Sequence, residues 1–389
     1  METHDHGLFA EIAERGAARA ATDDHQWVRG MLRFESALAT AQAELGLVPA
    51  PAAADVASVV DDLDHDLDGI DPDSLGAAAA AGGNPVIPLV QRLRTLLSDE
   101  SARHVHQGAT SQDALDTAAM LVARDATSAV LGALAAAGDV TAALTRTHRR
   151  TPTIGRTLMQ QAVPTTFGLK AASWLRGLDG AYRRLARVRE NLPVQLGGPV
   201  GSRGGAGASA LRLGELVAAH LELAAAPPWH TDRLPVADLA GALGSCCGAV
   251  GKVAGDVVLL AQQEVGEVRE EAPGRGGSSS MAHKQNPVAA IAARASARRA
   301  PALVAHLLGC MEQEHERAAG AWHAEWLPLR DLLRTSGSAA GWLADCLDHL
   351  VVDADAMLRH LPDPVPALDL EANDVLIDAA LSDHDRLAR

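Results

Sequence analysis

The chain has 389 residues and a formal net charge of −15 at pH 7, so nucleic acids and anionic membrane surfaces are poor partners for it. Hydrophobic residues make up 48% of the sequence but aromatic residues only 3%, and a core of Ala, Leu and Val favours closely packed helices over sheets. The length predicts two or three subdomains, and the negative charge means that local donors must hold any anionic substrate.

The sequence shows neither a targeting segment nor a disulfide framework. Met1–Gly16 is polar and acidic and lacks the basic and then apolar pattern of a signal segment. The apolar stretch Leu234–Ala261 is not expected to span a membrane, because it is interrupted by Asp238, Lys252 and Asp256. The cysteines lack metal-ligand spacing and are expected to be small buried residues; they are Cys246, Cys247, Cys310 and Cys346. We therefore expect a cytoplasmic protein without a metal site.

Long segments with helical spacing and almost no alternating strand pattern dominate the chain. The longest are Ser111–Arg149, Pro164–Arg189, Pro235–Glu270 and Pro287–Arg317. A helix of about 35 residues is about 50 Å long and needs partners along its whole flank, so these helices predict a bundle. We expect an all-α protein with an N-terminal helical domain over 1–95, a central long-helix bundle over 96–345 and a short C-terminal helical region over 346–389.

The segment His106–Asp113 lies directly before the first long helix. Thr110 and Asp113 have the spacing of a capping box, which is the structural interpretation of this segment. The functional interpretation is that the free amides of the first turn bind a carboxylate together with Thr110, Ser111 and Gln112. Both can hold at once if one hydroxyl caps the helix while another faces a ligand.

The segment Arg156–Gly168 lies before the second long helix and contains the pair Gln160 and Gln161. Pro164 suits the first position of a helix, so we expect the helix to begin there. The threonines that follow Pro164 are then either plain first-turn residues or ligand contacts.

The most informative segment is the loop at residues 276–287, which reads Gly-Gly-Ser-Ser-Ser-Met-Ala-His-Lys-Gln-Asn-Pro. The two glycines allow sharp turns or movement, three hydroxyls follow, and Lys284 supplies one ammonium group. Pro287 suits the first position of the next helix, whose N-terminus would favour anions. The structural interpretation is a Ser/Gly linker, and the functional one is a mobile loop with nucleophile-type oxygens.

Two further polar residues have both a structural and a functional interpretation. Asn84 precedes a proline, which is typical of a turn, but its amide could also contact a substrate. Arg317 follows Glu314 and Glu316, so it could form an ordinary ion pair on a helix surface. It could equally clamp a carboxylate through two parallel hydrogen bonds.

Together these segments resemble the conserved regions of the fumarase/aspartase superfamily, whose members break a C–O or C–N bond β to a carboxylate. The loop matches the signature of that superfamily at seven of eleven positions, namely Gly277, Ser278, Ser279, Met281, Lys284, Asn286 and Pro287. Ala282 stands where the superfamily normally has proline. The segments around Thr110 and Gln161 are most similar to the members that cyclise 3-carboxy-cis,cis-muconate.

The resemblance implies roles for individual residues. It makes Ser278 the catalytic base, with Lys284 and backbone amides stabilising its alkoxide. It implies substrate contacts for Asn84, His106, Thr110, Ser111, Gln112, Arg156, Gln161, Ser279, Met281, Asn286 and Arg317. Adenylosuccinate lyases place a proton-donating histidine at the position of Gln161, and fumarases use one at the position of Leu158. Neither histidine is present here, which argues against those two activities and leaves the acid unidentified.

The resemblance also implies a fold and a reaction. The central helices of four subunits would form the tetramer core, each active site would draw residues from three subunits, and no cofactor would be needed. The C-terminal region is shorter than in most members. We expect a cycloisomerase that converts 3-carboxy-cis,cis-muconate to γ-carboxymuconolactone in protocatechuate breakdown. The alternatives are a β-elimination lyase that releases fumarate from an amino- or nitrosuccinate, which Leu158 keeps open, and an inactive helical scaffold.

Overall fold

A computed structural model describes residues 7–65, 67, 69–203, 206–281, 284–364, 368 and 370–387 of the chain. Ala282, singled out in the sequence, lies outside these described residues. Helices account for most of the described chain, and the strands that it contains are short. The expected all-α class is therefore confirmed.

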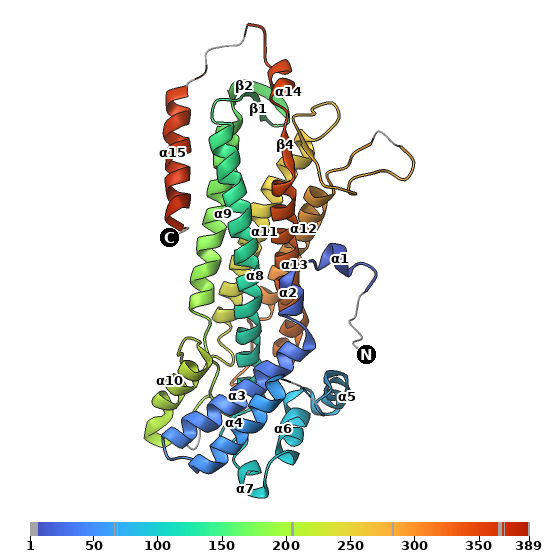
Figure 1. The fold of residues 1–389 in the computed structure, drawn as a ribbon. Coiled ribbons are helices and arrows are strands. Elements are labelled where there is room, and N and C mark those ends of the chain that lie inside the picture. Colours follow the sequence, from blue (N-terminus) through green and yellow to red (C-terminus); the bar gives the residue numbers. More distant parts are fainter. Residues whose placement is uncertain are drawn as a thin grey trace.

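Five long helices form an elongated bundle (Figure 1). They are α8 (Ser111–Thr147), α9 (Phe167–Glu190), α11 (Leu234–Leu260), α12 (Val288–Gly309) and α13 (Ala321–Asp348). With 37 residues, α8 is roughly 55 Å long and runs along the bundle from the short helices below it to the β1–β2 hairpin. Its buried side chains are mainly Ala, Leu, Val and Thr, so neighbouring helices can approach closely. The bundle predicted from the apolar spacing is thus present.

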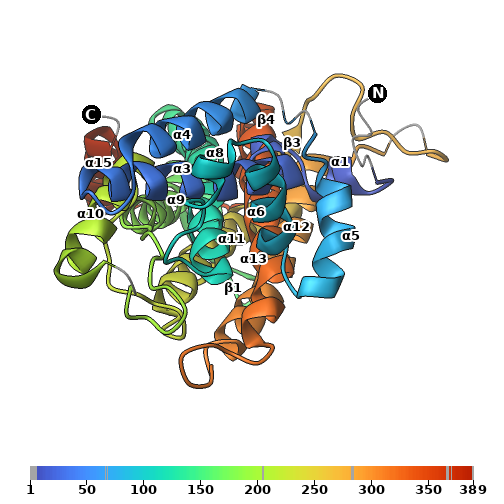
Figure 2. The same ribbon diagram turned by 90° about the horizontal axis from the view of Figure 1, so that it is seen from below.

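Shorter helices gather around the start of α8, at what we call the lower end of the molecule (Figures 1 and 2). They are α3 (Asp24–Glu44), α4 (Ala50–His65), α5 (Pro72–Gly82), α6 (Val86–Thr95), α7 (Asp99–Ala102) and α10 (Ala210–Leu221), the last preceded by the 3-10 turn η1 (Gly207–Ser209). Helix α3 crosses α8 where a Cβ on Gly30 would lie 3.0 Å from the Cβ of Ala118, so a small residue is needed there. Two further short helices, α1 (Ala10–Ala13) and α2 (Ala17–Ala20), lie beside the bundle.

Three expected helix boundaries were wrong, two of them because short strands occupy the ends of those segments and the third because the helix expected to reach Arg317 ends in a turn after Gly309. The second long helix begins at Phe167, not at Pro164, since β1 (Pro152–Thr157) and β2 (Gln160–Thr166) pair as an antiparallel hairpin. Pro164, which has no N–H to donate, lies in β2 opposite Ile154. The third helix ends at Leu260, because β3 (Val268–Glu270) pairs with the distant β4 (Leu350–Val352). The hairpin marks what we call the upper end (Figure 1).

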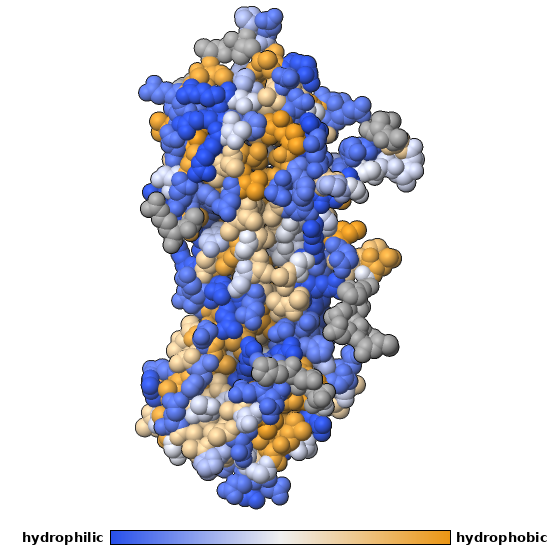
Figure 3. Space-filling model, in the orientation of Figure 1, coloured by the Kyte–Doolittle hydropathy of each residue, from blue (hydrophilic) through white to orange (hydrophobic). Residues whose placement is uncertain are grey.

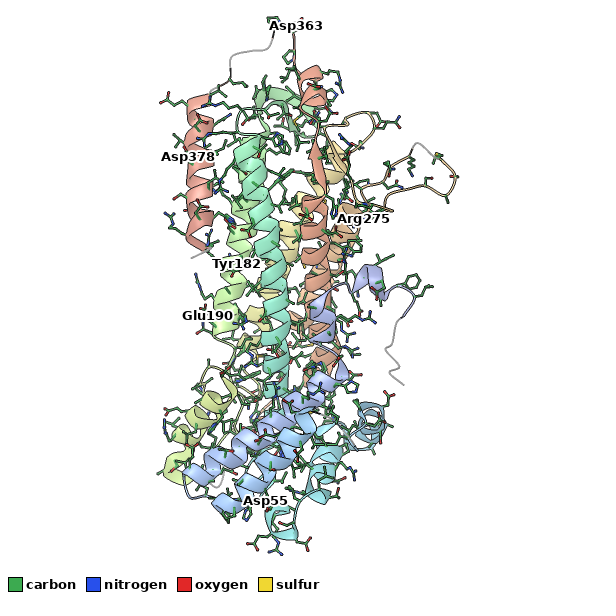
Figure 4. The ribbon with its side chains drawn as sticks, in the orientation of Figure 1. Asp55, Tyr182, Glu190, Arg275, Asp363 and Asp378 are labelled. Carbon is green, nitrogen blue, oxygen red and sulfur yellow. The ribbon has the colours of Figure 1, made fainter. Side chains whose placement is uncertain are left out.

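The C-terminal region returns to the bundle in two helices, α14 (Ala354–Arg359) and α15 (Leu370–Leu387). Helix α15 lies along α9, and a small apolar core joins it to α8 and α9. Arg149 at the end of α8 forms ion pairs with Asp374 and Asp378 of α15 (Figure 4). Helix α15 is therefore held on the bundle by both apolar and charged contacts.

The apolar helices α8 and α11 are long enough to cross a membrane by length and composition alone. Both pack against other helices of the bundle, and 39% of the most apolar stretch of α8 and 44% of that of α11 is buried within this chain. All four cysteines are free and buried, as the sequence indicated. Burial raises the pKa of the Cys246 thiol to about 12 and that of Cys247 to about 11, so neither is a reactive thiolate at neutral pH.

Candidate active site

The predicted site residues fall into three separate groups within one chain. The lower group lies near the start of α8 and contains Asn84, His106, Thr110, Ser111, Gln112 and Arg317. The upper group lies on the β1–β2 hairpin and contains Arg156 and Gln161. The third group is the loop that projects from the side of the bundle and contains Ser278, Ser279, Met281, Lys284 and Asn286. The lower and upper groups lie at opposite ends of α8, about 50 Å apart, so one small ligand cannot contact both in a single chain.

The start of α8 forms the capping box that the sequence predicted. The Asp113 carboxylate accepts a hydrogen bond from the Thr110 amide at 3.0 Å, and the Thr110 hydroxyl accepts one from Arg317 at 2.7 Å. The backbone amides of Ser111 and Gln112 and the Ser111 hydroxyl donate to no group in the described part of the chain. These three donors stand together at a helix N-terminus, where an anion is favoured.

Asp113 does more than cap the helix. Its carboxylate is fully buried and accepts hydrogen bonds at 2.8–3.0 Å from the side chains of Gln195 and His230 and from the amides of Gly197 and Gly198. The segment at 195–198 is therefore attached directly to the first turn of α8. This ties the lower group to a rigid part of the bundle.

Gln112 is fully buried, which the sequence did not indicate. Its Nε2 donates to Asp116 at 3.1 Å and to the carbonyl oxygen of His230 at 2.9 Å, while its Oε1 has no partner among the residues that the structure describes. Asp116 in turn pairs with the buried Arg233, which also pairs with Glu325. Burial raises the pKa of Glu325 above its ordinary value despite the attraction of Arg233. The Gln112 side chain thus belongs to an internal polar network, and its contact with a substrate remains a prediction.

His106 is held by a buried carboxylate. Its Nδ1 lies 2.6 Å from Oε1 of Glu35, whose side chain is almost completely buried on α3. Burial alone would lower the pKa of His106, but the charge and the hydrogen bond of Glu35 outweigh it, so the pKa is raised. The imidazole is therefore stabilised as a cation beside the α8 N-terminus.

Asn84 and Arg317 complete the lower group. The Asn84 side chain accepts a hydrogen bond from the amide of Val86 at 3.1 Å, which is the turn contact expected of an Asn-Pro pair. Arg317 lies between α12 and α13 and not on a helix, so the interpretation as an ion pair on a helix surface was wrong; its guanidinium also donates to the carbonyl oxygen of Pro199, at 3.3 Å. Neither contact uses all the donors of the side chain, so both residues keep donors that a ligand could use.

The upper group contains an ion pair that the sequence did not reveal. Arg156 donates two parallel hydrogen bonds, at 2.9 and 2.7 Å, to the fully buried carboxylate of Glu267. His360, from the end of α14, places its Nδ1 2.7 Å from the same carboxylate. Burial would raise the pKa of Glu267, but Arg156 and His360 outweigh it, so the pKa is lowered and the carboxylate is ionised.

An open pocket of about 500 Å³ adjoins this ion pair. Its lining consists of Arg156, Met159, Gln160, Gln161, Glu264, Val265 and His360. The hairpin turn beside it has positive φ at both central residues, Leu158 (+50°) and Met159 (+65°), an uncommon conformation for residues other than glycine. The Leu158 side chain is 96% exposed, so the turn points away from its own chain.

The neck of the third group, the loop, is closed by contacts between Gly276 and Asn286. The amide and the side chain of Asn286 both donate to the carbonyl oxygen of Gly276, at 2.8 and 3.0 Å. Next to the neck, Arg275 lies against α13, where it pairs with Asp345 (Figure 4). Beyond it, the Ser278 Oγ accepts hydrogen bonds from the amides of Ser280 and Met281, at 3.3 and 3.2 Å.

The helix after this loop does not offer the anion site that Pro287 suggested. Helix α12 begins at Val288, with Pro287 as its N-cap residue. The amides of Ala289 and Ala290 donate to the carboxylate of Glu270 at 3.0 and 2.8 Å. A carboxylate of the protein itself therefore occupies these donors. The other expected donor, a helix start at Pro164, is also absent because Pro164 lies in a strand.

Three residues of these groups escaped the sequence analysis, namely Glu35, Glu267 and His360. Glu35 is an acidic residue on the apolar face of a helix, and this misplaced charge was a usable signal. Glu267 and His360 are 93 positions apart, and nothing in the local sequence connects them.

The family model described as "Lyase" matches residues 8–301 of the chain. A nitrosuccinate lyase from Streptomyces davaonensis is 43% identical over 370 residues, which cover 92% of this chain and 77% of that protein. A 3-carboxy-cis,cis-muconate cycloisomerase from Bradyrhizobium diazoefficiens is 42% identical over 360 residues, with coverages of 91% and 79%. The crystal structure of the 3-carboxy-cis,cis-muconate lactonizing enzyme from Pseudomonas putida superposes with a TM-score of 0.89 at 33% identity, covering 98% of this chain and 100% of that one.

Proposed function

The chain belongs to the lyase family of the fumarase/aspartase superfamily, and we propose that it is a cycloisomerase that converts 3-carboxy-cis,cis-muconate to γ-carboxymuconolactone. The observation that carries this proposal is the Ser278 hydroxyl, whose oxygen accepts two backbone hydrogen bonds in the loop. Four relatives named as cycloisomerases of this substrate, 38–42% identical to the chain, support it. The reaction needs no cofactor.

The reaction is an internal addition. An oxygen of one substrate carboxylate forms a C–O bond to the β carbon, and the π electrons of the double bond move toward the α carbon and its carboxylate. The doubly charged, enolate-like carboxylate that results becomes an ordinary carboxylate again when Ser278 gives its proton to the α carbon; the serine that would act as the base in the elimination direction is thus the acid in the addition direction. Serine is then left as an alkoxide, which the amides of Ser280 and Met281 and the ammonium of Lys284 stabilise until solvent returns the proton.

We also propose that the protein is a cytoplasmic homotetramer with active sites shared by three subunits. The separation of the lower, upper and loop groups supports this, because no single chain can gather them around one small polycarboxylate. The exposed hairpin turn at Leu158 and the hydrophobic residues along the middle of the bundle in Figure 3 also support it. Such surfaces commonly mark contacts between proteins.

The test is to mix the purified protein with 3-carboxy-cis,cis-muconate and follow its ultraviolet diene absorbance. We expect the absorbance to fall, and we expect Ser278→Ala to slow this by roughly 10²–10⁴-fold, the usual contribution of a positioned proton-transfer group. Ser245→Ala, which removes an exposed hydroxyl of α11, is the matched control and should leave the rate unchanged. Unchanged absorbance with the wild-type protein would exclude this substrate.

A second function is favoured by one specific observation, the 43% identity to a nitrosuccinate lyase. In that reaction Ser278 would take the α proton while nitrite leaves the β carbon, and fumarate would be released. Fumarate and nitrite assays on nitrosuccinate distinguish it from the cycloisomerase. If the protein is an inactive scaffold, it will turn over neither substrate, and the wild-type protein and Ser278→Ala will bind each substrate equally well.

A further inference from the structure

The buried carboxylate of Glu267 holds two side chains from distant parts of the chain. Arg156 occupies both of its oxygens, and the Nδ1 atom of His360 lies 2.7 Å from Oε1. Because the carboxylate is ionised and can only accept hydrogen bonds, the Nδ1 atom of His360 must carry the hydrogen. This fixes both the ring orientation and the tautomer.

The other ring nitrogen of His360 remains available. Its Nε2 has no hydrogen-bond partner within the described part of the chain, and the side chain is 25% exposed. The ring lines the open pocket together with Gln160 and Gln161. A carboxylate-held imidazole with one free nitrogen in a pocket is the arrangement that positions histidine for contact with a reacting ligand.

The charges around the pocket indicate what this nitrogen would contact. Arg156 is neutralised by Glu267, and the remaining charged group of the lining, Glu264, is negative. Glu267 carries one negative charge but faces both Arg156 and His360, so among the described lining residues a protonated His360 would add a positive charge that Glu267 alone cannot balance. A carboxylate entering the pocket would favour the protonated ring, whose Nε2–H would then point toward it.

We propose that His360 contacts the substrate, with its protonated Nε2–H donating a hydrogen bond to a substrate carboxylate, and that Glu267 is the positioning residue that orients it. This inference rests on the proposed function for placing the hairpin in the active site. His360 keeps its proton throughout, so the proton given to the α carbon still comes from Ser278. The contact stabilises negative charge without a further proton transfer.

Kinetics of His360→Gln and His360→Ala on 3-carboxy-cis,cis-muconate test the contact. We expect KM to rise by roughly 10- to 100-fold, the effect of losing a hydrogen bond to a charged group. The matched control is His349→Gln, because His349 is also held by a carboxylate, that of Asp345, but does not line the pocket. The control should keep the wild-type KM. Wild-type KM and kcat in both His360 variants would overturn the proposal.

A double substitution tests the positioning role of Glu267. Glu267→Gln alone should raise KM, because the carboxylate then no longer orients the His360 ring. In the His360→Gln background the same substitution should leave KM unchanged, since the group that Glu267 orients is already gone. A purely structural role for Glu267 would raise KM by the same factor in both backgrounds, and that result would contradict the assignment.

A binding measurement separates this inference from the proposed function. Histidine-labelled Ser278→Ala protein is titrated with tricarballylate, a stable tricarboxylate, and the imidazole nitrogens are followed by NMR, with His360→Gln identifying the resonance. We expect the Nε2 resonance of His360 to shift. A shift without turnover of the muconate would leave the contact standing and remove the proposed substrate. Turnover of the muconate without a shift, and with wild-type KM in His360→Gln, would leave the proposed function standing and overturn the contact. If neither turnover nor a shift were seen, the proposed function and the contact would both be overturned.

Discussion

At the scale of single residues, the buried carboxylates decide how the polar side chains are used. Glu35 holds His106, Glu267 holds Arg156 and His360, and Glu270 fills the amides at the start of α12. Each of these carboxylates is almost completely buried, and an unpaired charge there would be costly. The partners are therefore held in fixed orientations within the chain.

The pH dependence of stability tests the Glu35–His106 pair. Because the folded-state pKa of His106 is raised, the pair stabilises the protein fully below the pKa of the unfolded chain and loses this contribution as the pH rises through the folded value. We expect Glu35→Gln to lower the free energy of unfolding by roughly 1.5–3 kcal/mol at acidic to neutral pH, and by less in alkaline solution. Urea unfolding at several pH values measures this.

The control for this pair is the same substitution in a His106→Gln background. There the effect of Glu35→Gln should no longer decrease between neutral and alkaline pH, because the histidine of the pair has been removed. In the wild-type background, Glu35→Gln could instead lower the free energy of unfolding by the same amount from acidic to alkaline pH. That result would show that the pair does not titrate as described.

At the scale of elements, the loop between β3 and α12 combines a rigid base with an open tip. Glu270 caps α12, Arg275 is anchored on α13, and the neck is closed at Gly276 by Asn286. Beyond the neck, the Lys284 side chain is exposed, and it has no partner in the described chain. The base therefore fixes where the loop that carries Ser278 leaves the bundle.

Replacement of the neck glycine tests this arrangement. Gly276 has φ of +92°, and a Cβ there would lie 2.8 Å from the carbonyl oxygen of Asn286, so alanine must distort the neck. We expect Gly276→Ala to lower kcat by at least about tenfold, since misplacing a catalytic group by about 1 Å can cost 10²-fold, with a small change in Tm. Gly277→Ala, where a Cβ would meet nothing within 4 Å, is the control. Equal rates in the two variants would exclude a role for the neck.

At the scale of the whole molecule, the length of the bundle separates the groups that must meet. Helix α8 holds the lower and upper groups about 50 Å apart, so the α8 N-terminus of one copy, the hairpin of another and the loop of a third must come together in the proposed tetramer. A monomer would then have no complete site.

Mixing two inactive variants tests this sharing. Ser278→Ala removes the loop group and Arg317→Ala removes a donor of the lower group, and each alone should be nearly inactive. If different subunits supply these groups, random mixed tetramers should regain roughly a quarter of the wild-type activity, because some sites then receive both intact residues. Co-expression with two affinity tags and an activity assay measures this. No recovery in verified mixed tetramers would place both groups in one chain.

The elements were predictable where the information is local. The spacing of apolar residues defined the long helices, Thr110 and Asp113 marked the start of α8, and the composition of residues 276–287 marked the loop. The helix start predicted at Pro164 was wrong because a proline suits both the first turn of a helix and a position in a two-stranded hairpin. The pairing of β1 with β2 places Pro164 in the hairpin.

By itself, the sequence determined the helical class, the order of the long helices and the serine loop, because periodicity and turn chemistry act over a few neighbouring residues. Only the tertiary structure decided which carboxylate meets which cation. Glu35 and His106 are 71 positions apart and Glu267 and His360 are 93 apart, and these distances are bridged by the path of the helices. Such pairs depend on packing between elements, and no local pattern encodes it.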